Sequence, residues 1–142
     1  MDDQIDPAGL DVVWLALDKS GQLGAFVTAG EGPIPAAALR CPVMRIEEVE
    51  SALRSLPRIA SAELRVSVPR PDDFVELAER GLFVYDWTDI HRRRKDYLNA
   101  YELAAVPIGA RLKLSNLPSE LGEFACRALL DKGCLGDQII RV

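Results

Sequence analysis

The 142-residue chain has one histidine, three cysteines and no long uninterrupted apolar stretch. Its apolar runs fall far short of the roughly 20 residues that a membrane-spanning helix needs, so we expect no membrane partner. The three cysteines include no C-x-x-C pair, and one histidine leaves no zinc-ligand spacing. We therefore expect no metal and no other cofactor. Free cysteines are among the most buried residue types, so we interpret Cys41, Cys126 and Cys134 as buried thiols.

The residues that catalysis needs are scarce as well. The single histidine, His91, follows an aromatic segment in a polar stretch, and no serine or cysteine lies in a recognisable nucleophile motif. Three pairs of adjacent carboxylates have ordinary structural explanations, on a terminus, a polar helix face and a helix start: Asp2 and Asp3, Glu47 and Glu48, and Asp72 and Asp73. The sequence therefore predicts a protein that is not an enzyme.

Composition is that of one soluble domain, which we expect to span residues 1–142. Hydrophobic residues make up 49% and charged residues 27% of a 15.6 kDa chain. The net charge of −5 repels phosphate backbones, so we expect no nucleic-acid partner, whereas a basic protein would be attracted. The segment Met1–Asp6 is acidic where a secretory signal is basic and then apolar, which predicts a cytoplasmic protein.

Local patterns indicate an α+β fold. A β-hairpin is predicted from Val12–Leu17 and Leu23–Thr28, joined by a turn with Gly21, and Ile46–Leu56 has the apolar periodicity of a helix. Further strands are expected at 62–68, 82–87, 101–106, 110–114 and 139–142, and further helices at 36–39, after a capping box at Asp73 and Glu76, and at 118–132. Strands separated by few short helices predict a single domain, a largely antiparallel sheet with a few helices packed on it.

One basic cluster follows the aromatic strand, at Arg92, Arg93, Arg94 and Lys95. Near Tyr85 and Trp87 it resembles a stacking surface for single-stranded nucleic acid, but the neighbouring aspartates favour a solvated loop or a protein-binding loop. Trp, Tyr and Arg are enriched where proteins bind one another. Our candidate partner-binding residues are therefore Glu31, Asp86, Trp87, Asp89, Arg92, Arg93 and Arg94.

Two blocks of the sequence carry a family resemblance. The first begins Trp14-Leu15-Ala16 and ends with Gly30-x-Gly32-Pro33-x-Pro35, and the second is Phe83–Asp89 followed by Tyr101-Glu102-Leu103. Together they cover about a third of the chain and resemble small, acidic bacterial immunity proteins of polymorphic or contact-delivered toxin systems. The resemblance implies a non-enzymatic inhibitor that binds and neutralises a cognate toxin protein, basic in many such systems, in the cytoplasm of the producing cell.

Two alternatives remain open at this point. An α+β domain of this size also suits a small-molecule-binding or enzymatic role, with a pocket beside the aromatic strand 82–87. The other alternative is a homo-oligomer, in which a long apolar edge strand at Ile139–Val142 pairs with another copy of the chain.

Overall fold

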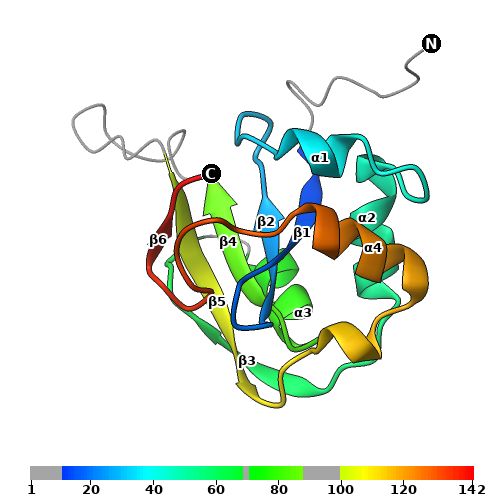
Figure 1. Ribbon diagram of the computed structural model, residues 1–142. Helices are drawn as coiled ribbons and strands as arrows, with labels where there is room; N and C mark the ends of the chain where they lie inside the picture. The colour runs from blue at the N-terminus through cyan, green and yellow to red at the C-terminus, as the bar shows by residue number, and fades with distance from the viewer. Residues whose placement is uncertain (1–10, 69–70, 88–99) are drawn as a thin grey trace.

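The computed structural model describes residues 11–68, 71–87 and 100–142. It has a six-stranded curled sheet with four α-helices, which confirms the predicted α+β class (Figure 1). The strands are β1 (Val13–Leu17), β2 (Leu23–Val27), β3 (Ala60–Leu64), β4 (Phe83–Trp87), β5 (Tyr101–Gly109) and β6 (Ile139–Ile140). The helices are α1 (Ala36–Leu39), α2 (Ile46–Arg54), α3 (Asp72–Ala78) and α4 (Ser119–Arg127), with a short 3₁₀ helix, η3 (Leu114–Asn116).

The sheet has the order β1-β2-β4-β5-β3, and β6 pairs with β5 beyond the end of β3. Every pair is antiparallel except β2 with β4, so the sheet is largely antiparallel, as predicted. Helices α2 and α4 pack against β1, and α3 packs across β3, β4 and β5. The parallel pair arises because α1, α2, β3 and α3 separate β2 from β4 in the chain, which gives room for a crossover.

The hairpin of β1 and β2 forms as predicted, in the register Val13 opposite Val27. Its turn is held by Asp18, whose carboxylate accepts hydrogen bonds from the backbone N–H groups of Ser20, Gln22 and Leu135 at 2.9–3.0 Å. Gly21 supplies the positive φ, +89°, that the turn needs. Burial alone would raise the pKa of Asp18, but these hydrogen bonds hold it below its ordinary value. The turn thus also anchors the C-terminal segment.

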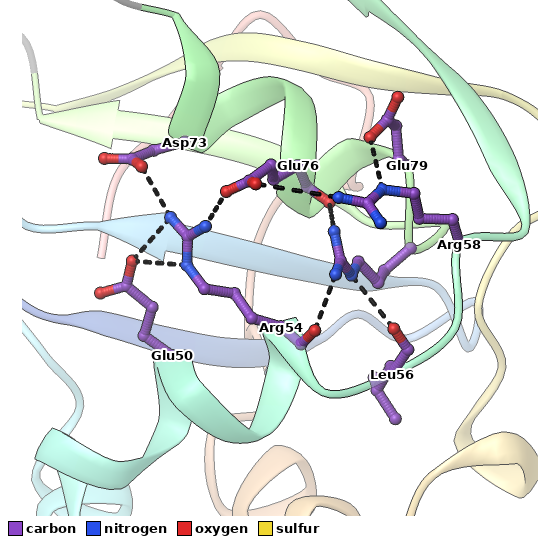
Figure 2. A network of polar contacts seen from close by, with 8 residues as sticks. Glu50, Arg54, Leu56, Arg58, Asp73, Glu76 and Glu79 are labelled. Carbon is purple, nitrogen blue, oxygen red and sulfur yellow. Dashed lines mark hydrogen bonds and ion pairs between the residues drawn. The ribbon is translucent and has the colours of Figure 1, made fainter.

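The predicted capping box of α3 is wrong. Helix α3 begins after Pro71 without a side-chain cap, and both predicted members bind a residue of α2 instead. Arg54 forms ion pairs with Asp73 at 2.7 Å, with Glu50 at 3.1 Å and with Glu76. Figure 2 shows the Arg54 guanidinium between these three carboxylates. The two acids therefore join α3 to α2 rather than cap their own helix.

A buried arginine completes this junction. The Arg80 guanidinium donates to three backbone carbonyl oxygens, those of Arg54 (2.7 Å), Glu76 (2.9 Å) and Leu56 (3.1 Å). Arg80 is only 6% exposed, and its pKa is lowered by burial and by the nearby charges of Arg58 and Arg54, with Glu79 opposing. Because the last carbonyls of a helix lack partners within it, Arg80 closes the C-terminal end of α2.

Three predicted elements differ from the structure, two of them because a distant segment competes for the backbone. The predicted helix 118–132 ends at Arg127, since the Ala128 carbonyl and the Leu130 N–H bond the backbone of Leu17. The predicted strand 62–68 ends at Leu64, because the Leu103 N–H of β5 donates to Gln138 beside β6. The predicted strand 110–114 is absent, because Gly109 turns the chain at φ +99°.

The predicted cysteine environments are wrong for two of the three. Cys41 is buried, but Cys126 and Cys134 are exposed. Cys126 lies on the outer face of α4, whose inner face is formed by Leu121, Phe124 and Ala125. The terminal edge is also short, since β6 has two residues and Ile140 is buried. The long apolar edge expected at Ile139–Val142 is therefore not formed.

Candidate functional site

Four carboxylates gather at one end of the sheet, and we call this group the acidic end: Asp11, Glu31, Asp86 and Glu102. Strand β1 is antiparallel to β2, β2 is parallel to β4, and β4 is antiparallel to β5. This end of the sheet therefore contains the start of β1, the ends of β2 and β4, and the start of β5. Asp11 precedes β1, Glu31 follows β2, and Asp86 and Glu102 lie within β4 and β5. Strand pairing places Glu102 opposite Asp86, the charges of Asp11 and Glu102 act on Asp86, and Glu31 follows β2 at the same end of the sheet.

Asp86 is the buried member of the acidic end, with 9% of its surface exposed. It lies beside Val27 of β2 and directly opposite Glu102 of β5. Burial, together with the negative charges of Asp11 and Glu102, raises the pKa of Asp86 to about 7, although a hydrogen bond from the Trp87 backbone N–H lowers it. Strongly raised pKa values in carboxyl groups are typical of functional sites.

The loop after β2 holds Glu31 at this end. The Thr28 carbonyl accepts hydrogen bonds from the Glu31 N–H at 3.0 Å and the Gly32 N–H at 2.8 Å. Asp11 Oδ1 accepts from the N–H of Ala29 at 3.2 Å, and Ala29 has the left-handed φ of +52°. The backbone of the loop is therefore held by several hydrogen bonds, and the Glu31 side chain extends into solvent as an exposed charge.

The predicted partner-binding residues fall into three groups. Glu31 is exposed, whereas Asp86 and Trp87 are buried, with 9% and 5% of their surfaces exposed. The Trp87 ring packs edge-to-face on Tyr101, with centroids 5.1 Å apart, so Trp87 belongs to the core. Asp89, Arg92, Arg93 and Arg94 lie outside the described residues. A partner contact at these positions stays a prediction.

Sequence reasoning missed Asp11 and Glu102 as members of the acidic end. Both were visible as acids next to or within predicted strands, but only the pairing of β1 with β2 and of β4 with β5 places them beside Asp86. A carboxylate directly opposite another across an antiparallel pair is unfavourable. In this pair Asp86 is buried and Glu102 is partly exposed, which marks this end of the sheet as unusual.

The two sequence blocks that carry the family resemblance meet inside the core. Trp14 stacks on Phe26 at 4.4 Å, Phe26 stacks on Tyr85 at 4.8 Å, and Tyr101 packs edge-to-face on Phe26. Gly32 lies against the Tyr101 ring so closely that an added Cβ would be 2.3 Å from its hydroxyl oxygen. The aromatic residues of the two blocks and Gly32 therefore build the scaffold.

Surface hollows lined by described residues include two of similar volume. One, of about 430 Å³, is lined by Pro35, Leu129, Leu130, Asp131, Lys132, Arg141 and Val142. The other, of about 450 Å³, is lined by Ser20, Gly21, Gln22, Arg111, Leu112, Lys113, Leu114 and Ser115. Neither is lined by a residue of the aromatic segment 82–87, where the alternative hypothesis expects its pocket.

Within 11–68, 71–87 and 100–142, no group of three or more His, Cys, Asp or Glu side chains is arranged to hold a metal ion. No helix in those ranges has the length and apolar character to cross a membrane.

In comparisons with known proteins, no family model, no curated protein and no solved structure matches this chain.

Proposed function

We propose that this chain is a protein-binding domain whose acidic end binds a basic surface of a partner protein. Following the sequence resemblance, we propose further that the partner is a bacterial toxin, and that the chain is an immunity protein that neutralises it in the cytoplasm. The observation that carries the proposal is the gathering of Asp11, Glu31, Asp86 and Glu102 at one end of the sheet.

The electrostatics of this end favour a cationic partner. A surface of one charge sign attracts its opposite and speeds their encounter, most strongly at low salt. The raised pKa of Asp86 reflects burial and the charges of Asp11 and Glu102, so a cation bound nearby would offset that repulsion. Binding near neutral pH would then lower the pKa of Asp86 and release a proton. This makes protonation a readout specific to the acidic end.

Rigidity supports the same role. Asp86 and Glu102 are fixed by strand pairing, and hydrogen bonds to Thr28 and Asp11 hold the backbone that carries Glu31. Pre-organised contact groups lose little conformational entropy on association, which favours tight binding from a small surface. The alternative of a small-molecule or enzymatic site beside strand 82–87 draws less support from the described residues, since Phe83, Val84, Tyr85 and Trp87 of β4 all belong to the hydrophobic core.

The test compares the natural chain with two double variants of equal net charge. Glu31→Gln with Glu102→Gln removes two charges from the acidic end, and Glu47→Gln with Glu120→Gln removes two exposed charges at the starts of α2 and α4. Each protein captures partners from the lysate of the source organism at low and moderate salt. Each captured partner is then expressed alone and together with the chain, and cell growth is measured.

The proposal expects one stoichiometric partner that binds the natural chain and the α2/α4 variant and is lost from the acidic-end variant. That partner should stop growth when expressed alone and be harmless when co-expressed. A partner that is retained equally by all three proteins would show that the acidic end is the wrong surface. A partner that is harmless alone would overturn the toxin assignment, and the absence of any partner would overturn protein binding.

A further inference from the structure

Strand β3 is the last strand of the sheet, and no segment in the described part of the chain pairs with its outer edge. Ala62 of β3 lies opposite Pro107 of β5, which has no N–H to donate. In an antiparallel pair, hydrogen-bonded and non-hydrogen-bonded positions alternate, so Ala62 and Leu64 direct their N–H and C=O groups away from β5. These outward groups are available to another strand.

The side chains along this edge have features of an interaction surface. Leu64, the last residue of β3, is 39% exposed. Glu63 and Arg65 flank it on the opposite face, form an ion pair at 2.9 Å and are each 52% exposed. The Arg65 N–H still donates to the Ala104 carbonyl at 2.8 Å, so the extended backbone continues past Leu64 in the same register. Charged side chains are one means by which proteins protect an edge strand. Here the charges are of both signs and lie on either side of a leucine in the sequence.

Glu63 and Arg65 of two copies face each other in one register only. In a two-fold antiparallel pairing of β3 with itself, the outward-directed residues must face one another, so the two-fold axis passes through a residue, and Ala62 to Arg65 are the candidate centres. Centring on Glu63 or on Arg65 places like charges directly opposite, which is unfavourable. Centring on Ala62 would need the Ala60 N–H, which already donates to the Glu79 carbonyl. Centring on Leu64 places each Glu63 opposite the Arg65 of the other copy.

We propose that a second copy of this chain pairs antiparallel with the outer edge of β3, with Leu64 opposite Leu64 and Glu63 opposite Arg65 across the two-fold axis. The edge binds through main-chain hydrogen bonds, and the charged pairs select the register. β3 pairs with Ala105–Gly109 of β5, whereas the acidic end includes Glu102 near the other end of that strand. Figure 1 shows β3 along the lower part of β5 and β6 along the upper part. The proposal is therefore independent of the proposed function.

The test is the solution mass of the full chain, measured by sedimentation equilibrium over a wide concentration range at low salt. The natural chain should change from 15.6 kDa to twice that mass as its concentration rises. Glu63→Arg and Arg65→Glu, each alone, should raise the dimer dissociation constant roughly tenfold or more, because each places like charges opposite in two symmetric pairs. The double variant Glu63→Arg with Arg65→Glu should restore dimerisation, since it exchanges the charges but keeps every opposite-sign pair.

Arg45→Glu is the matched control. Arg45 also forms an exposed ion pair with a glutamate two residues away, Glu47 at 3.7 Å, but it lies next to α2. Its reversal should leave the dimer unchanged, and thermal unfolding of each variant checks folding. A natural chain that stays monomeric at all concentrations would overturn the proposal. A dimer that both single reversals leave intact, or that the double variant fails to restore, would overturn the register.

Discussion

The hydroxyl of Tyr101 accepts a hydrogen bond from Trp14 Nε1 at 3.1 Å and donates one to the Pro33 carbonyl at 2.9 Å. These contacts join β1, β5 and the loop after β2 at a single atom in the core. Both aromatic side chains are fully buried, and burial raises the pKa of Tyr101 above its ordinary value. The hydroxyl is therefore a neutral structural group that fixes the loop which carries Glu31.

Gly32→Ala tests how tightly this loop is held. An added Cβ would lie 2.3 Å from the Tyr101 hydroxyl oxygen, so the loop or the ring must move and the hydrogen bonds must lengthen. We expect a loss of about 1–3 kcal/mol in the free energy of unfolding, measured by chemical denaturation. Gly122→Ala is the control, because that glycine lies within α4 with its nearest outside atom at 3.9 Å and should gain about 0.5–1 kcal/mol. Equal effects at both positions would contradict the close packing at Tyr101.

Asp86→Asn tests the acidic end through pH. Because the pKa of Asp86 is raised from 3.8 to about 7, the folded chain binds this proton more tightly than the unfolded chain does. The contribution of Asp86 to stability is therefore greatest below its unfolded pKa and is lost as the pH rises through about 7. We expect Asp86→Asn to match the natural chain near the acid limit and to be more stable above neutrality, by at most about 4 kcal/mol.

The measurement is the free energy of unfolding across this pH range, with exposed Asp131→Asn as the control. The control should follow the natural chain at every pH. If the gain in unfolding free energy of Asp86→Asn over the natural chain does not grow with pH, the surroundings of Asp86 do not raise the pKa of its carboxyl group.

Arg80→Met and Arg54→Met compare the loss of a buried arginine with the loss of a partly exposed one. Arg54 forms more ion pairs, but its partners are 36–70% exposed, and such pairs contribute on the order of 1 kcal/mol or less. Arg80 satisfies three carbonyl oxygens in a buried position, so its loss should cost about 2–4 kcal/mol. We expect Arg80→Met to be the more destabilising change in thermal unfolding at moderate salt. The reverse order would place the strength of the α2–α3 junction in the network of Figure 2.

Thiol labelling tests the cysteine environments. Cys126 and Cys134 are exposed and Cys41 is buried, so a small aromatic disulfide reagent should modify two of the three thiols quickly in the folded chain. The third should react only under unfolding conditions. Mass spectrometry of peptides from the labelled chain identifies which thiols reacted. Rapid modification of Cys41 would show that its packing beside α1 opens readily.

Elements whose cause is local were predictable from the sequence. The hairpin of β1 and β2 follows from two apolar runs around Gly21, and α2 follows from the helical spacing of Ile46, Val49 and Leu53. The overall class followed too, because many strands with few short helices have few ways to bury their apolar faces. The exposed position of Glu31 in a glycine- and proline-rich loop needed no tertiary information either.

The tertiary structure alone decided the local structure at positions where distant segments compete for the same backbone group or the same charge. Helix α4 ends early because the backbone of Leu17 in β1 forms hydrogen bonds with Ala128 and Leu130. Asp73 forms an ion pair with Arg54 instead of the predicted helix cap. The acidic end exists only because strand pairing places Glu102 opposite Asp86. A sequence pattern reports neighbours within a few residues, whereas these contacts join segments far apart in the chain. Their outcome depends on which segment reaches a free donor, acceptor or charge, and that is a property of the folded sheet.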